Sequence, residues 1–124
     1  IKPNLLGTVL MQAAYSDAGA QWVDDLVAYL DGNRQLVEDA ANAIPGVRAM
    51  PVQSTYLAWF DFTDTGMDMA EVIRRVRGDA RLGASVGADF GTGGESYMRF
   101  NIGTPRAVLV EAMERLQTAF ADLQ

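Results

Sequence analysis

The chain has 124 residues, 49% of them hydrophobic and 21% charged, and its 16 acidic and 10 basic residues give a net charge of −6 at pH 7. Such a chain is long enough for one globular domain, and its acidic balance argues against a nucleic-acid or anionic-membrane partner, because both require a basic patch. Cysteine and histidine are absent, which excludes disulfides, thiolate metal sites and histidine acid-base chemistry.

The sequence shows no targeting or membrane signal. Its apolar runs are too short to cross a bilayer, and residues 1–4 lack the charged and apolar regions of a signal peptide. We therefore expect a cytoplasmic protein. The chain begins without methionine, so we also expect a fragment or a processed product.

Two helices are expected first. Apolar residues recur at helical spacing over 5–14 until residues 16–19 interrupt the pattern, which predicts a short helix. A long helix follows over 18–45, and we expect it to tolerate Gly32 at a cost of about 1 kcal/mol. Its apolar stripe consists of Trp22, Leu26, Tyr29, Leu30, Asn33, Val37, Ala40, Ala41 and Ile44.

Strand patterns follow the long helix. Residues 47–52 predict a modest strand, which Pro51 confines to an edge or a strand end. Residues 55–62 are apolar on both faces and rich in aromatics, which predicts a central strand covered on each side. A surface outside this chain is one candidate for that cover.

A short amphipathic helix is expected next. Asp68 and Glu71 form a start that resembles a capping box, and the pattern stops at Gly78. Arginines cluster in and after this helix, at Arg74, Arg75, Arg77 and Arg81. We interpret them as a solvated face whose cations complement the helix dipole.

A glycine-rich segment covers residues 83–94. A phosphate loop is disfavoured, because no Gly-Lys-Ser/Thr follows and the next residues predict a strand rather than a helix. We favour a flexible loop beside a ligand site, since glycine permits close approach of a ligand to the backbone.

Arg99 lies within the last apolar strand pattern, at residues 96–103. An arginine in a partly buried strand requires an anion to offset its desolvation. The residues alone allow two partners, namely a ligand carboxylate or a structural ion pair with Asp61, Asp89 or Glu95.

The final helix is expected to have Thr104 as its N-cap and Pro105 at its first position. Arg106 then opposes the helix dipole, and we interpret it as solvent-exposed. The predicted buried stripe is Val108, Leu109, Ala112, Met113, Leu116 and Phe120.

Other conspicuous residues receive structural interpretations. Core or interdomain packing is favoured over ligand stacking for Trp22, Tyr29, Tyr56, Trp59, Phe60, Phe62, Phe90 and Phe120. The carboxylate pairs Asp24–Asp25 and Asp61–Asp64 predict no metal site, because adjacent residues on a helix point apart and no third ligand is evident.

The order of elements predicts an α+β fold, with a small mixed or antiparallel sheet of three to four strands and helices packed on it, preceded by the long helix. We expect one domain over 1–124, with a short leading helix in 1–17, the long helix in 18–45 and an α+β core in 46–124.

A family resemblance runs through nearly the whole chain in register. Its motifs are residues 7–15, residues 21–30 with Asn33, residues 55–62, Phe90-Gly91 with Gly93-Gly94, Met98 to Arg106, and Glu111 to Leu116. Each motif is weak alone, but in this order they resemble class I/II aminotransferases of fold type I. The most similar branch is the carbon-sulfur β-lyases of the cystathionine β-lyase type.

The resemblance implies the C-terminal small domain of a pyridoxal-phosphate enzyme, with the long helix between the domains. Arg99 matches the arginine that binds the substrate α-carboxylate. The Schiff-base lysine of the family lies upstream in a Ser-x-x-Lys context, which Lys2 does not match. No catalytic, cofactor-binding or metal residue is therefore assigned to this chain, which we expect to be inactive alone.

The implied function is β-elimination on cystathionine or cysteine conjugates by a complete enzyme that is a homodimer. An aminotransferase is the nearest alternative. From a different class, a stand-alone regulatory module that senses an amino acid through Arg99 also fits the residues.

Overall fold

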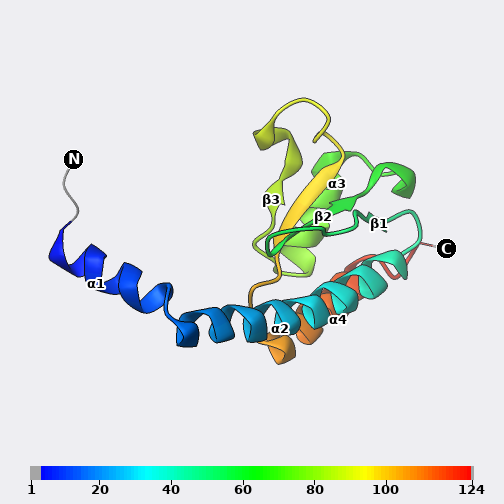
Figure 1. The fold of residues 1–124 in the computed structure, drawn as a ribbon. Helices are drawn as coiled ribbons and strands as arrows, with labels where there is room; N and C mark the ends of the chain where they lie inside the picture. Colours follow the sequence, from blue (N-terminus) through cyan, green and yellow to red (C-terminus); the bar gives the residue numbers. More distant parts are fainter. Residues whose placement is uncertain (1–3, 124) are drawn as a thin grey trace. The chain divides into compact units, whose positions relative to one another are not determined.

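The computed structural model describes residues 4–123 and divides into two compact units, one up to Asp31 and one from Gly32 onward. The first unit holds helix α1 (Leu5–Ala14) and the beginning of helix α2 (Asp17–Asn42) (Figure 1). Asn4 caps α1, because its side chain accepts a 2.6 Å hydrogen bond from the Gly7 N–H. The predicted short helix is confirmed, but the interruption is limited to Tyr15 and Ser16, because α2 already begins at Asp17.

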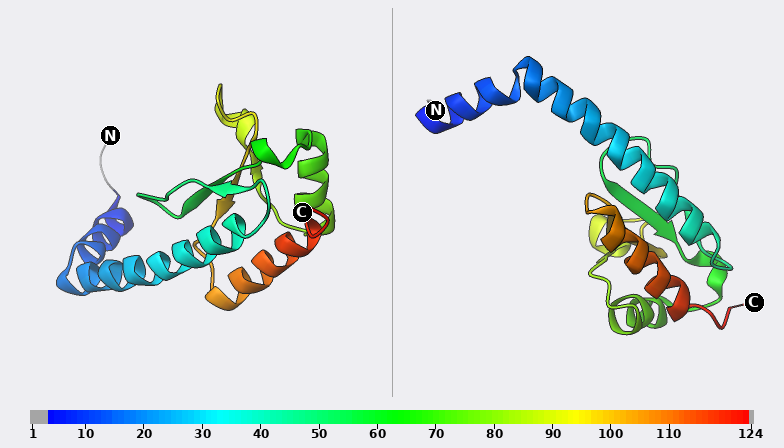
Figure 2. Two further views of the ribbon diagram at one scale, coloured as in Figure 1. Left: turned by 90° about the vertical axis from the view of Figure 1, so that its right-hand side faces the viewer. Right: turned by 90° about the horizontal axis from the view of Figure 1, so that it is seen from below.

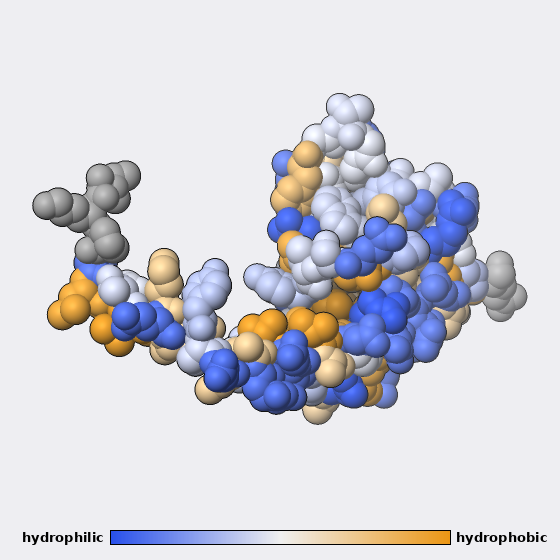
Figure 3. Space-filling view, viewed as in Figure 1, coloured by the Kyte–Doolittle hydropathy of each residue, from blue (hydrophilic) through white to orange (hydrophobic). Residues whose placement is uncertain are grey.

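The helices of the first unit expose most of their apolar side chains. No residue of α1 is buried, Leu5 is 82% exposed and Trp22 is 64% exposed. Figure 3 shows hydrophobic surface along α1. Trp22 and Tyr29 are therefore not core residues of the described chain, and the interdomain packing that the sequence also allows for them stays a prediction.

The second unit contains a four-stranded antiparallel sheet. Its strands are β1 (Arg48–Ala49), β2 (Leu57–Asp61), β3 (Ser85–Val86) and β4 (Tyr97–Asn101), in the order β1-β2-β4-β3. The edge position of β1, the central position of β2 and the α+β class are confirmed. Strand β3 corrects the prediction of a flexible loop over 83–94, and a 3₁₀ turn, Gly87–Phe90, follows it.

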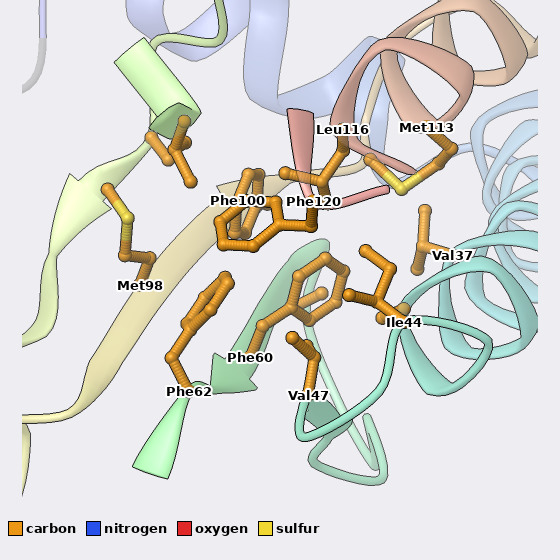
Figure 4. Close-up of a cluster of buried hydrophobic side chains, with 14 of the residues drawn as sticks. Val37, Ile44, Val47, Phe60, Phe62, Met98, Phe100, Met113, Leu116 and Phe120 are labelled. Carbon is orange, nitrogen blue, oxygen red and sulfur yellow. The ribbon is translucent and has the colours of Figure 1, made fainter. Parts of the chain in front are cut away.

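The core lies on one face of this sheet. Phe60 of β2 and Phe100 of β4 stack with ring centroids 4.5 Å apart, and Leu116 and Phe120 pack from the helical side (Figure 4). The fully buried side chains include Val37, Phe60, Phe62, Val72, Val76, Met98, Ile102, Leu116 and Phe120. Phe60, Phe62 and Phe120 are thus core residues, as predicted.

The opposite face of the sheet is only partly covered. Leu57 and Trp59 are half-buried, whereas their neighbours Ala58 and Phe60 are fully buried. Tyr56 is 49% exposed and Phe90 51% exposed, so neither is a core residue of this chain. Full cover of β2 on each side, expected from its apolar sequence, is not provided by the described residues.

Two helical segments cover the core face. The part of α2 from Gly32 and helix α4 (Arg106–Ala119) lie side by side (Figure 2), and Gln117 Nε2 donates a 3.0 Å hydrogen bond to the Ala40 carbonyl. Val108 is 52% exposed, so its predicted place in the buried stripe is wrong, whereas Leu109, Met113, Leu116 and Phe120 are buried as expected.

The start of α4 also differs from the prediction. Pro105 has an extended backbone and is the N-cap residue, and no side chain caps the helix. The Val108 and Leu109 N–H groups donate to the Pro105 carbonyl instead. The prediction that Thr104 caps this helix is therefore wrong by one residue.

Helix α3 (Met69–Ile73) continues into a π-helical turn, Arg74–Asp79, and a 3₁₀ turn, Thr63–Thr65, precedes it. Asp68 caps α3 by accepting a 2.8 Å hydrogen bond from the Glu71 N–H, as predicted. The Glu71 carboxylate faces the arginines instead of closing a capping box. The helical segment ends at Asp79, one residue after the predicted stop.

The arginine cluster contacts groups of this chain. Arg74 pairs with Glu71 at 2.7 Å and with Asp79 at 2.9 Å. Arg75 pairs with Glu71 at 2.8 Å and also with Asp122, which joins the end of α3 to the C-terminal segment. Arg77 and Arg81 complete the cluster, and Arg77 donates to the Ala84 carbonyl. These contacts fit a structural role for the cluster.

We expect the Glu71 cluster to make the fold less stable in acid. Hydrogen bonds from Arg74 and then Arg75 lower the pKa of Glu71 from 4.5 to about 2. A lowered pKa means that Glu71 stabilises the fold above pH 4.5 and that this contribution is lost as the pH falls from about 4.5 to about 2. Urea unfolding of Glu71→Gln should therefore show a shallower loss of stability across this window.

The matched control is Glu114→Gln. Glu114 is an exposed residue of α4, and no residue of the described chain lies within ion-pair distance of it. Its substitution should leave the acid dependence of unfolding unchanged. Equal slopes for Glu71→Gln and the parent chain would contradict the assignment.

Candidate functional site

Arg99 occupies the centre of the partly covered face of the sheet. It lies on β4, opposite Trp59 of β2 and opposite Ser85 of β3. Its neighbours Met98 and Phe100 are buried in the core, so the alternation of a strand places Arg99 on the other face, where it is half-buried. The core thereby fixes the backbone that carries this cation.

No carboxylate among residues 4–123 lies within ion-pair distance of the Arg99 guanidinium. Asp61 instead accepts hydrogen bonds from the Thr63 N–H and hydroxyl, and Glu95 accepts from the Gly93 N–H at 2.8 Å. The structural ion pair, which the sequence left open as an alternative, is therefore not formed. The guanidinium donors remain available to another anion.

Two hollows border this part of the sheet. The first, of about 310 Å³, is lined by Arg99, Trp59 and Leu57 together with residues 50–55. The second, of about 340 Å³, lies between Trp59, Tyr97 and the glycine-rich segment. Trp59 and Met50 line both hollows, and Phe90 lines the second one. Gly87 and residues 90–94 border the second hollow, and the ligand site expected beside this segment stays a prediction.

A row of contacting aromatic side chains extends from Arg99 across this face of the sheet. The guanidinium carbon of Arg99 lies 4.0 Å from the Phe90 ring centroid. Phe90 meets Trp59 edge to face at 5.4 Å, and Trp59 meets Tyr97 at 6.4 Å. The Tyr97 hydroxyl donates a 3.3 Å hydrogen bond to Asp61. Trp59 and Phe90 thus make their ring contacts on the face opposite the core.

The Asp61 carboxyl group, which accepts the hydrogen bond from Tyr97, is held in its ionised form. Burial raises the pKa of Asp61, but hydrogen bonds from Thr63 and Tyr97 and the charge of Arg48 outweigh burial, and its pKa lies below the ordinary 3.8. Burial and the adjacent Asp61 raise the pKa of the Tyr97 hydroxyl. The Tyr97 hydroxyl therefore stays protonated as a donor to Asp61.

Asn33 supports the site from below and was not assigned a function from the sequence. It is fully buried, and its Nδ2 donates to the carbonyls of Ile102 at 2.9 Å and Thr104 at 3.0 Å. Arg106 Nε donates to Asn33 Oδ1 at 3.1 Å. The signal for this role was a polar residue inside an apolar helical stripe.

Gly32 allows this arrangement. A Cβ at this position would lie 2.4 Å from Arg106 Nη2. The absence of a side chain at Gly32 therefore leaves room for the Arg106 guanidinium beside Asn33. Arg106 is exposed, as predicted, but its side chain donates a hydrogen bond to Asn33 of α2. The strand end that follows Arg99 is thus tied to α2.

The described residues contain neither a Schiff-base lysine nor a cluster of metal-ligating side chains. They contain no lysine, and Lys2, the one lysine of the chain, lies outside them. Within residues 4–123 no group of three acidic side chains is placed to hold a metal ion. No helix in that range has the length and apolarity to cross a bilayer. A Schiff-base lysine for pyridoxal phosphate is therefore not among residues 4–123.

Comparison with known proteins agrees with the resemblance. No family model matches the chain. It is 31% identical over 119 residues to the cystathionine β-lyase PatB of Bacillus subtilis, and the match covers 95% of this chain and 30% of PatB. The chain therefore spans about a third of the length of the curated relatives that it matches.

Solved structures show the same correspondence. Cystalysin from Treponema denticola, a structure that contains pyridoxal 5'-phosphate, matches with a TM-score of 0.88 and 30% identity over 100% of this chain and 32% of its own. A pyridoxal-phosphate-bound putative aminotransferase from Clostridium difficile matches with a TM-score of 0.87 and 30% identity, over 97% and 31% of the two chains. This chain is homologous to the C-terminal part of the fold type I pyridoxal-phosphate enzymes that comprise cystathionine β-lyases and aminotransferases.

Proposed function

We propose that this chain is the part of a pyridoxal-phosphate-dependent carbon-sulfur β-lyase that binds the α-carboxylate of the amino-acid substrate through Arg99. The observation that carries the proposal is the free, half-buried guanidinium of Arg99, which has no carboxylate partner among the described residues and lines a hollow of about 310 Å³. Its place on a strand anchored in the core favours a fixed binding position.

The chemistry of the site follows from the guanidinium. A planar guanidinium grips a carboxylate through two parallel charge-assisted hydrogen bonds, which fix both the position and the plane of the carboxylate. With the carboxylate fixed, the substrate Cα has one orientation relative to the rest of the site, and that orientation determines which of its bonds reacts. Trp59 and Leu57 line the same hollow, so apolar surface lies beside the guanidinium that would hold the carboxylate.

The remaining groups belong to the rest of the complete protein. Pyridoxal phosphate, when bound there, supplies the electron sink for the reaction at Cα. The same proposal includes a cytoplasmic homodimer and cystathionine or a cysteine conjugate as substrate, which the family resemblance implies. Relatives described as cystathionine β-lyases support this substrate class.

The test is the complete protein with Arg99→Ala, assayed on cystathionine with pyruvate and ammonia as the products measured. We expect kcat/KM to fall by about 30- to 1,000-fold, or about 2 to 4 kcal/mol, because the substrate carboxylate loses its charged partner. Arg99→Lys should recover part of the loss, since it restores the charge without the fork of donors.

Arg74→Ala is the matched control, because Arg74 is an exposed arginine whose partners are Glu71 and Asp79. It should leave kcat/KM unchanged. Equal kinetics of Arg99→Ala and the parent across several amino acids would reject the carboxylate role.

An aminotransferase is the second candidate, because the Clostridium difficile structure described as a putative aminotransferase matches as well as cystalysin does. The two reactions are separated by their products: a lyase releases pyruvate and ammonia, whereas an aminotransferase consumes a 2-oxo acid and forms a new amino acid. Binding of an amino acid by the complete protein without either reaction would favour the regulatory module.

A further inference from the structure

The contact between Phe90 and Arg99 suggests a second residue with a role in carboxylate binding. The guanidinium carbon of Arg99 lies over the Phe90 ring, 4.0 Å from its centroid. A cation held by the face of an aromatic ring is attracted to it without any of its N–H donors being used in a hydrogen bond. We propose that Phe90 is a positioning residue, which holds the Arg99 guanidinium in place while its donors stay open to a substrate carboxylate.

Phe90 is itself held from the neighbouring strand. Its ring meets Trp59 edge to face, with centroids 5.4 Å apart and planes at 76°. Trp59 is the residue of β2 directly opposite Arg99. The three side chains therefore form one group. Strand pairing places Trp59 and Arg99 opposite each other, Trp59 contacts and orients the Phe90 ring, and the ring restrains the Arg99 guanidinium.

The backbone that carries Phe90 is fixed at its base by two glycines. A Cβ on Gly87 would lie 2.3 Å from the Gly94 carbonyl oxygen, and a Cβ on Gly94 would lie 2.3 Å from that of Gly87. The two main chains thus meet where side chains would prevent it. Residues 88–93 form a loop with a closed base, and Phe90 projects from it.

The exposure of Phe90 separates this role from core packing. Half of the residue (51%) is exposed, so truncating it removes less buried area than truncating a core phenylalanine. A double-mutant cycle with Arg99 then tests whether an effect of Phe90 on substrate binding acts through Arg99. This inference rests on the proposed carboxylate role of Arg99.

The test is a double-mutant cycle in the complete protein, with kcat/KM for the amino-acid substrate as the readout. Phe90→Leu, which removes the ring but keeps a large apolar side chain, should lower kcat/KM by about 3- to 30-fold, mainly through KM. Phe90→Tyr keeps the ring face and should remain within about twofold of the parent. In the Arg99→Ala background, Phe90→Leu should have no further effect, because its partner is gone.

A spectroscopic measurement checks the contact directly in this chain. The side-chain proton resonances of Arg99 should be displaced by the ring current of the aromatic residue at position 90. This displacement should persist in Phe90→Tyr and disappear in Phe90→Leu, while the amide spectrum of the core stays the same.

The outcomes of the cycle distinguish the two proposals. If Arg99→Ala changes nothing, the proposed function fails, and the positioning role fails with it. If Arg99→Ala lowers kcat/KM but Phe90→Leu does not, or lowers it equally in both backgrounds, only the positioning role is overturned. Loss of the effect in the Arg99→Ala background supports it.

Discussion

Asn33→Leu is expected to destabilise the chain by about 2 to 6 kcal/mol. The leucine leaves the carbonyls of Ile102 and Thr104 without the donor that they have now, and each buried polar group left unpaired costs about 1 to 3 kcal/mol. Leucine also offers no acceptor to Arg106 Nε. Urea unfolding followed by circular dichroism measures the loss.

Asn33→Asp separates the donors of this residue from its shape. The aspartate keeps an acceptor oxygen for Arg106 but has no donor for the two carbonyls, so it should also be strongly destabilising despite its nearly identical volume. A small effect of Asn33→Asp together with a large effect of Asn33→Leu would mean that shape, not hydrogen bonding, determines the stability here.

The second large effect is expected from Phe60→Ala, at about 3 to 5 kcal/mol. Phe60 is completely buried and stacks on Phe100 at 4.5 Å (Figure 4). Its truncation leaves a cavity in the core beside β2, and the neighbouring strands β1 and β4 cannot move in to fill it, because each is held in place by its backbone pairing with β2.

Two controls accompany this substitution. Phe60→Leu retains most of the volume and should lose markedly less stability. Tyr56→Ala removes an aromatic side chain that is 49% exposed and should cost about 1 kcal/mol or less. If Tyr56→Ala and Phe60→Ala were equally destabilising, the core would not be centred on the face that contains Phe60.

The sequence was informative where a pattern extends over several residues. The apolar run around Trp59 predicted a central strand, and the alternation around Arg99 placed a cation on a strand face. Strand β3 was missed because Ser85 and Val86 are only two residues, which is too short for any period, and because glycines surround them. Residues 85–86 form a strand because they pair with β4, and not because their own composition favours one.

The site was predicted less completely than the fold, for a physical reason. Arg99 could be identified from the sequence because it is a charged residue within an otherwise apolar strand pattern. The stacking of Phe90 on Arg99 depends on how the turn over Gly87–Phe90 packs against the sheet, which no local pattern records. Asn33 was placed in the correct helical stripe, but its partners are 69 and 71 residues away, and only the folded chain brings them together.

The strand order β1-β2-β4-β3 also has a consequence for how the chain is made. The last strand in the sequence, β4, lies between β2 and β3 in the sheet. Until residues 97–101 have been synthesised, β3 therefore has no partner strand and one edge of β2 is unpaired. Non-local pairing of this kind is slow to form, and the inner edge of β2 stays open to other chains meanwhile. During synthesis the nascent sheet is therefore most vulnerable to misassociation just before the strand that carries Arg99 leaves the ribosome.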